Sequence, residues 1–164
     1  MKKYKFAFTS LSILVGMVTL LIWSENVPRA TAHCQVPCGI YDDPARIRGL
    51  YEDTATIAKA IDNITKLSGK TDAESINQLT RWINTKEDHA SHIIKVVSEY
   101  FLTQKVKRVA DGSPGYDAYL KTLADHHAVL AAAMKTKQKP ETGNVRNLQR
   151  AIHTIQHHYE KHNH

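Results

Sequence analysis

The sequence contains very few cysteines. Only Cys34 and Cys38 occur among its 164 residues, which excludes a small domain held together by several disulfide bonds. A bridge between these two would close a loop of only a few residues, and a crosslink stabilises less when the loop is short. Their spacing is also unusual for a zinc or thioredoxin motif. A disulfide and a pair of metal-binding sulfurs therefore both stay open as interpretations.

Other patterns are missing as well. No segment shows the strict apolar–polar alternation of a half-buried strand, which leaves helices as the expected secondary structure. The formal net charge of +6 comes from scattered basic residues without interleaved aromatics, so no nucleic-acid partner is expected. Without residues 1–32 the net charge is +3, and a weakly cationic surface of this kind can still attract a small anion.

The first 32 residues have the organisation of an export signal. Lys2, Lys3 and Lys5 precede an apolar run over residues 6–23, and a polar region then ends in Ala30-Thr31-Ala32. Ala-x-Ala is a signal-peptidase pattern, so residues 1–32 are predicted to be removed. The alternative is an uncleaved membrane anchor, because 18 apolar residues approach the length of a membrane span. Cleavage predicts an exported protein, periplasmic or secreted, without stable membrane association.

The remaining chain, residues 33–164, predicts one domain of four helices. A helix is expected over residues 44–67, capped by Asp43 and stopped at Ser68-Gly69. A second helix of about 30 residues should follow a capping box at Thr71-Asp72-Ala73-Glu74. Residues 111–115 break the chain before a third helix, and residues 139–143 before a fourth. The predicted fold class is all-α, a four-helix bundle.

Apolar residues at three- and four-residue spacings indicate which face of each predicted helix is buried. The expected core positions are Ile47, Leu50, Ile57, Ile61 and Ile64 on the first helix; Ile76, Leu79, Ile83, Ala90, Ile93 or Ile94, Val97 and Phe101 on the second; Tyr116, Tyr119, Leu120, Leu123, Leu130 and Met134 on the third; and Val145, Leu148, Ile152, Ile155 and Tyr159 on the fourth.

The most informative segment lies directly after the predicted cut. A cut after Ala32 makes His33 the new N-terminus, followed by Cys34 and, four residues later, by Cys38. An α-amine, an imidazole and two thiols are then gathered within six residues. Amine, imidazole and thiolate are metal ligands, and thiolates with nitrogen donors suit square-planar nickel or copper.

Residues 33–41 read His-Cys-Gln-Val-Pro-Cys-Gly-Ile-Tyr. This segment, called the hook here, resembles the N-terminal hook of nickel superoxide dismutases, whose pattern is His-Cys-x-x-Pro-Cys-Gly-x-Tyr. All six fixed positions are present, including Pro37, Gly39 and Tyr41. The resemblance implies nickel as cofactor, superoxide as substrate, and a four-helix bundle assembled as a homohexamer. It implies that Ni(II)/Ni(III) cycling converts superoxide to dioxygen and hydrogen peroxide.

The resemblance also implies a ligand set. The α-amine of His33 and the backbone nitrogen of Cys34 are separated by two carbons and can close a five-membered chelate ring on one metal. The sulfurs of Cys34 and Cys38 complete the equatorial donors, and the imidazole of His33 becomes an axial ligand. Thiolate and amide donation stabilise trivalent nickel, which explains why such ligands suit the reaction. Pro37 and Gly39 shape the turn.

Two tyrosines are expected beside the metal without binding it. By resemblance, Tyr41 places its phenol over the vacant face and orders water. Tyr100, in Ser98-Glu99-Tyr100-Phe101, matches an acidic-Tyr-Phe segment of the family, although ordinary helix packing also explains a tyrosine there. Some members hold the hook imidazole with a glutamate on the first helix, where this chain has arginine within residues 46–48. That imidazole then needs another acceptor, for which Glu52 is a candidate by position alone.

Ten histidines leave further alternatives open. His153 and His157, like His158 and His162, are spaced to share a helix face, either as a solvated helix end or as a low-affinity metal store. No glutamate lies between a histidine pair in the zinc-protease arrangement. Besides a nickel superoxide dismutase, the sequence is compatible with an exported nickel- or copper-binding helical protein without turnover. A disulfide-containing helical interaction domain is a third possibility.

Overall fold

The computed structural model describes residues 42–160. Within this range the chain forms four α-helices: α2 (Asp43–Leu67), α3 (Ala73–Lys95), α4 (Tyr116–Gln138) and α5 (Thr142–Gln156). A π-helix, η1 (Val96–Lys105), continues α3 directly. No strand occurs between residues 42 and 160, and the predicted all-α four-helix bundle is confirmed.

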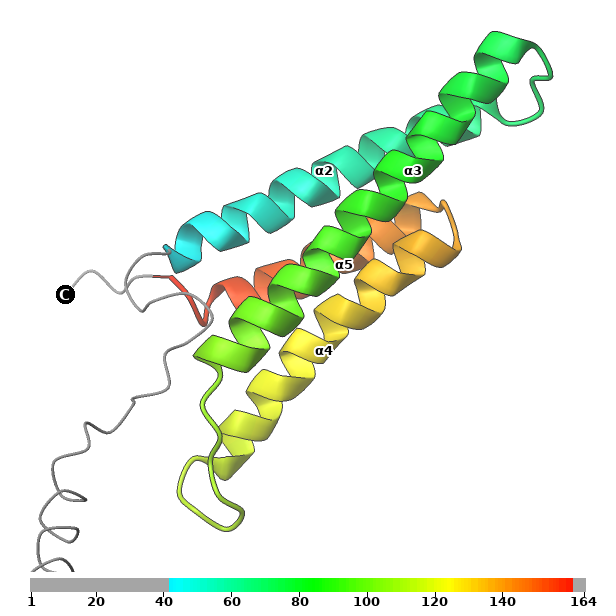
Figure 1. The fold of residues 1–164 in the computed structure, drawn as a ribbon. Coiled ribbons are helices and arrows are strands. Elements are labelled where there is room, and N and C mark those ends of the chain that lie inside the picture. The colour runs from blue at the N-terminus through cyan, green and yellow to red at the C-terminus, as the bar shows by residue number, and fades with distance from the viewer. Residues whose placement is uncertain (1–41, 161–164) are drawn as a thin grey trace, which may run out of the picture. The chain divides into compact units, whose positions relative to one another are not determined.

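The helices pack in the order of the chain. The main packing pairs are α2 with α3, α3 with α4, α4 with α5, and α5 with α2, so successive helices run antiparallel around a common core (Figure 1). The turn between α2 and α3 uses Gly69 at a φ of 83°, a left-handed conformation that glycine adopts without strain. The α2–α3 hairpin extends beyond the connection between α4 and α5.

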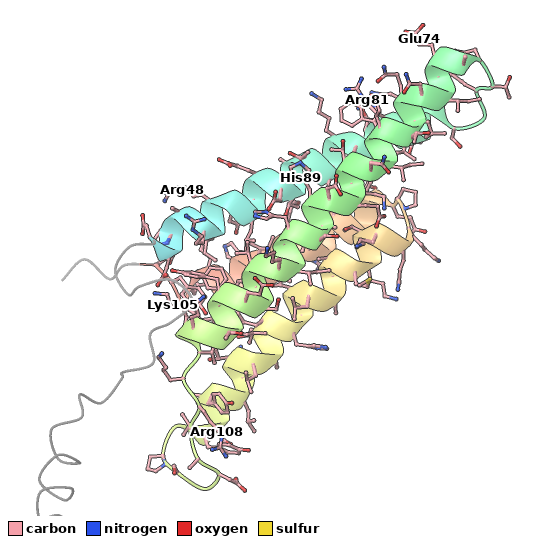
Figure 2. The ribbon with its side chains drawn as sticks, in the orientation of Figure 1. Arg48, Glu74, Arg81, His89, Lys105 and Arg108 are labelled. Atoms are coloured by element: carbon pink, nitrogen blue, oxygen red, sulfur yellow. The ribbon has the colours of Figure 1, made fainter. Side chains whose placement is uncertain are left out.

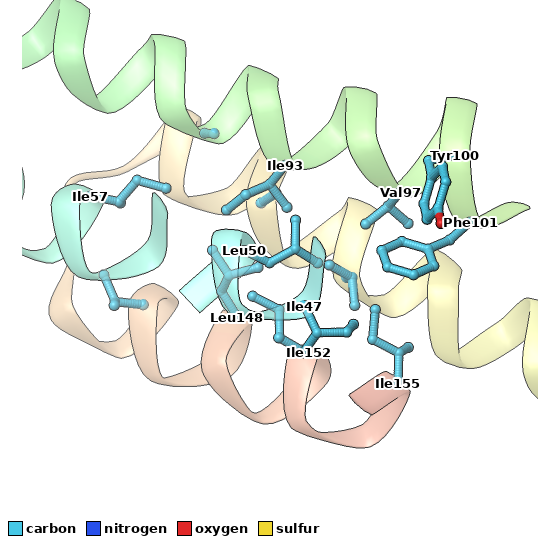
Figure 3. Close-up of a cluster of buried hydrophobic side chains, with 14 of the residues drawn as sticks. Ile47, Leu50, Ile57, Ile93, Val97, Tyr100, Phe101, Leu148, Ile152 and Ile155 are labelled. Carbon is cyan, nitrogen blue, oxygen red and sulfur yellow. The ribbon is translucent and has the colours of Figure 1, made fainter. Parts of the chain in front are cut away.

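The core is built from aliphatic residues of all four helices, closed at one end by aromatic rings (Figure 3). The fully or nearly fully buried side chains include Ile47, Leu50, Ile57, Ile61, Ala90, Ile93, Val97, Phe101, Val129, Ala133, Val145, Leu148, Ile152 and Ile155. The expected faces of the first and last helices are therefore confirmed, except that Tyr159 lies beyond the end of α5 and is only partly buried. Of the two residues on α3 between which the sequence did not decide, Ile93 is buried and Ile94 is only partly buried.

The expected faces of α3 and α4 are partly wrong. Ile76 is 49% exposed and Ile83 is 40% exposed, because this part of α3 lies in the extension that α4 and α5 do not cover. On α4, Leu120 and Met134 are exposed. The core instead takes a face with less conspicuous residues, namely His126, Val129, Ala133 and Thr136.

Lys86 interrupts the apolar face of α3. Its side chain is buried, with the ammonium donating to the backbone carbonyl of Lys137 at 2.9 Å and pairing with the carboxylate of Glu87. The lysine thus crosses from α3 to the last turn of α4, and its stem fills a place that an apolar side chain would occupy. A buried ammonium is tolerated because its donors are satisfied.

Two capping predictions also need correction. Asp42 rather than Asp43 is the N-cap of α2, and its side chain makes no capping hydrogen bond. Asp43 is already helical, and its carboxylate binds groups on η1 instead. At α3 the N-cap is Asp72, whose carboxylate accepts from the backbone N–H of Ser75 at 2.9 Å, so the helix starts one residue later than a capping box from Thr71 would place it.

Candidate functional site

Three polar side chains meet where α2 begins, directly after the hook in the sequence. The Tyr100 hydroxyl donates to Oδ1 of Asp43, and the Lys105 ammonium lies 2.9 Å from the same oxygen. The ammonium is also 5.4 Å from the centre of the Tyr100 ring, within the range of a cation–π contact. We call Asp43, Tyr100 and Lys105 the Asp43 cluster. Lys105 is visible beside the start of α2 in Figure 2.

The π-helix is what brings two members of this cluster together. Residues five apart in an α-helix lie about 140° apart around the axis, so Tyr100 and Lys105 would face different directions. In η1 the hydrogen bonds run between residues five apart, as from the Val106 N–H to the Phe101 carbonyl at 3.0 Å. Residues 100 and 105 then lie next to each other, and both reach Asp43.

The electrostatics of the cluster favour its protonated hydroxyl and its ammonium. Burial raises the pKa of Tyr100, and the hydrogen bond to the Asp43 carboxylate raises that pKa further. The hydrogen bond with Asp43 also raises the pKa of Lys105, against the opposing effect of burial. At neutral pH the cluster therefore consists of a neutral phenol, a carboxylate and an ammonium, with the phenol as donor.

Aromatic residues support Tyr100 from the core side. Its ring meets Phe101 edge-on at 5.1 Å between centres, and Phe101 packs against Tyr159 at 4.4 Å. The Tyr159 hydroxyl lies 2.7 Å from Nε2 of His126, which is fully buried, while Nδ1 of His126 lies 2.7 Å from the Thr122 carbonyl oxygen. Because that carbonyl only accepts, Nδ1 carries the proton and Nε2 accepts from Tyr159.

Tyr159 and His126 both have shifted pKa values. Burial raises the pKa of Tyr159, as do the nearby Asp43 and Tyr100. Burial lowers the pKa of His126, so the imidazole stays neutral and can accept the hydrogen bond. On its core side, the Asp43 cluster is therefore supported by packed rings and by the hydrogen bonds that join Tyr159, His126 and Thr122.

Apart from Asp43, the first turns of α2 show no acidic side chain in contact with the cluster. Ile47 belongs to the core, Arg48 is exposed and pairs with Asp42 at 3.8 Å, and Glu52 is exposed with its backbone carbonyl accepting from Thr56. Glu52 as partner of the hook imidazole stays a prediction, because His33 lies outside the described residues.

Histidines elsewhere form pairs, and none of them forms a three-ligand site in residues 42–160. His89 and His92 each place Nδ1 2.7 Å from an oxygen of Asp53, which is buried on α2. The rings of His153 and His157 lie 4.9 Å apart. The Asp53 arrangement was not anticipated, although the i,i+3 spacing of its two histidines was visible in the sequence.

Of the predicted site residues, the structure places Tyr100. It lies at the end of the bundle where the chain arrives from the hook, bonded to the second residue after Tyr41 in the sequence. His33, Cys34, Cys38 and Tyr41 lie outside the described residues. Sequence reasoning missed Asp43 and Lys105, because nothing in the sequence indicates a π-helix.

Comparison with known protein families gives one match. The family model described as nickel-containing superoxide dismutase matches residues 28–163. The chain belongs to the nickel-containing superoxide dismutase family. Searches of curated proteins and of solved structures gave no match.

Membership of this family establishes the activity. The protein is a nickel-dependent superoxide dismutase: nickel is its cofactor, and it converts superoxide to dioxygen and hydrogen peroxide. The matched residues include residues 33–41 and all the helices of the bundle, so the Asp43 cluster lies within the family's own domain. No helix between residues 42 and 160 of this dismutase is long and apolar enough to cross a membrane.

Proposed function

We propose that the dismutase holds its nickel in the hook, with His33, Cys34 and Cys38 as ligands, after removal of residues 1–32. The donor set suits the metal, since two thiolates and amine or amide nitrogens favour square-planar nickel. The described bundle contains no cluster of three metal-binding side chains, which leaves the hook as the candidate for the metal site. When bound, nickel supplies the one-electron chemistry that no side chain of the protein provides.

The observation that carries this proposal is the hydrogen bond from Tyr100 to Asp43. Tyr100 was predicted to lie near Tyr41 from a short segment alone. Its hydroxyl binds a residue only two positions beyond Tyr41, at the start of the helix that follows the hook. We therefore propose Tyr41 and Tyr100 as the residues that restrict access to the metal and order water beside it.

Export and assembly belong to the same proposal. Residues 1–32 act as a signal peptide, and the mature protein of residues 33–164 works in the periplasm or outside the cell, without stable membrane association. A homohexamer is the proposed assembly. Large side chains of α3 and α4 that remain exposed in the single chain, Ile76, Ile83, Leu120 and Met134, are compatible with contacts between copies.

The free N-terminus provides the sharpest test. A chain that begins at His33 should bind one nickel and consume superoxide, whereas a chain that begins Ala32-His33 should not. In the longer chain the amine of His33 becomes an amide, a far weaker acid than an α-amine of pKa about 8, and the first chelate ring cannot form in the same way.

The longer chain is a matched comparison because both thiols and the imidazole are kept. Nickel content by elemental analysis and superoxide consumption are measured for both chains, and N-terminal sequencing of the native protein gives the natural start. Equal activity of the two chains would exclude the proposed role of the cut. A native start other than His33 would do the same.

A further inference from the structure

We propose that Lys105 is a positioning residue of the dismutase: through Asp43 it holds the Tyr100 hydroxyl in the orientation needed beside the metal. This inference rests on the proposed hook site. It adds an ion pair whose two members lie on different elements, Asp43 on α2 and Lys105 on η1.

The first step of the argument is that one carboxylate oxygen serves two donors. Oδ1 of Asp43 accepts from the Tyr100 hydroxyl and lies 2.9 Å from the Lys105 ammonium. Asp43 lies in the first turn of α2, where the helix dipole also favours a negative charge. The carboxylate is thus fixed from two sides, and its free rotation is lost.

The second step concerns the freedom of the phenol. Tyr100 is 8% exposed, and Phe101 limits its ring on the core side. The ring is therefore held by packing, and the direction of the hydroxyl hydrogen depends on Asp43. Besides Asp43 and Lys105, the titratable group Tyr159, in the turn after α5, interacts electrostatically with Tyr100, and burial keeps the Tyr159 hydroxyl protonated.

The third step concerns the local backbone. A ten-residue π-helix is rare, and short π segments are frequent at functional sites. Its consequence here is that residues 100 and 105 share a face and a partner. Lys107, in contrast, donates to the Gln104 carbonyl at 2.9 Å within its own segment. Lys107 therefore provides a matched control with a lysine of similar position and no link to Tyr100.

The test is a double-mutant cycle in the nickel-loaded protein that begins at His33. Lys105→Met should lower the second-order rate of superoxide consumption about tenfold, the size of effect expected when a charge-assisted hydrogen bond is lost. Nickel content should stay unchanged. Lys105→Arg should restore the rate to within about twofold, because a guanidinium still pairs with a carboxylate. Lys107→Met should have no effect on the rate.

The decisive comparison is made in a Tyr100→Phe background. If Lys105 acts through the hydroxyl of Tyr100, then Lys105→Met has no further effect on the rate once that hydroxyl is absent. A purely structural role of Lys105 would lower the rate by the same factor in both backgrounds. Thermal unfolding of each variant separates loss of folding from loss of turnover.

The outcomes also separate this inference from the hook site. If Lys105→Met keeps the full rate, or if its effect persists unchanged with Tyr100→Phe, the positioning role is wrong and the hook proposal is unaffected. If Cys34→Ser keeps nickel and activity, the hook proposal itself fails.

Discussion

Replacing Tyr159 with phenylalanine removes one oxygen atom and leaves a buried imidazole without its donor. The Tyr159 hydroxyl lies 2.7 Å from Nε2 of His126, and His126 is fully buried between this hydroxyl and the Thr122 carbonyl. Once the hydroxyl is gone, Nε2 has lost the one partner described for it. An unsatisfied buried acceptor costs about 1–3 kcal/mol.

The same change at Tyr51 is the control. Tyr51 is only partly buried, and its hydroxyl donates to Oε1 of Gln156 at 2.8 Å. Water can replace this hydroxyl at the surface, so Tyr51→Phe should cost about 0.5–1 kcal/mol. The two variants lose the same atom and a hydrogen bond of nearly the same length. They differ in the acceptor residue, because His126 is fully buried and Gln156 is only partly buried.

Urea unfolding followed by circular dichroism measures both costs. The slope of the free energy of unfolding against urea concentration should be the same in both variants and the parent protein. For a domain of this size Tyr159→Phe should lower the melting temperature by roughly 3–10 °C. Equal losses in the two variants, or a larger loss in Tyr51→Phe, would refute the view that burial of His126 determines the cost. A change in the urea dependence would show an effect on the unfolded ensemble instead.

Three further outcomes are expected. Cys34→Ser and Cys38→Ser should each abolish nickel binding and dismutase activity while circular dichroism stays that of a folded bundle, since both cysteines precede α2 in the sequence. An active variant would contradict the ligand set. Tyr41→Phe should keep its nickel, measured by elemental analysis, because the ring remains. Its inhibition by small anions should change, because the hydroxyl that orders water is lost. Loss of the metal would assign Tyr41 a structural role. Acid should destabilise the bundle through His126, whose pKa is lowered by burial. The unfolded chain takes up the proton near pH 6.5 and the folded chain only at lower pH, so the free energy of unfolding falls with decreasing pH by at most about 1.4 kcal/mol per pH unit. In urea titrations between pH 7 and 5, His126→Gln should show a smaller dependence of this free energy on pH.

The bundle was largely predictable, and the reasons differ between helices. On α2 and α5 the apolar residues recur at helical spacing along the whole length, and all the expected core positions from Ile47 to Ile64 and from Val145 to Ile155 are buried. On α3 the pattern continues into a region that α4 and α5 do not cover. Periodicity there indicates a face but not whether another element packs against it, so Ile76 was wrongly assigned to the core.

The Asp43 cluster shows a different limit of sequence reasoning. Tyr100 was found because a short segment resembled the family, whereas Lys105 was missed because helical spacing places it on another face. The change from α-helix in α3 to π-helix in η1 alters which residues are neighbours, and no residue in Val96–Lys105 predicts this change. His126 was not singled out from the sequence, because its role depends on a hydrogen bond with Tyr159, which follows α5 and is 33 residues away in the chain.

The two ends of the bundle should differ in how readily they open. At the α2–α3 turn the chain is exposed from Ser68 to Glu74, and Ile76 beyond it has little to pack against, so amide protons there should exchange quickly through local fraying. At the end of the bundle where α2 begins, Tyr100 of η1 hydrogen-bonds to Asp43 of α2. Phe101 of η1 packs against Tyr159, whose hydroxyl bonds to the buried His126 of α4. Local unfolding should therefore occur more often at the α2–α3 turn than at the start of α2, which is the end nearest the hook in the sequence.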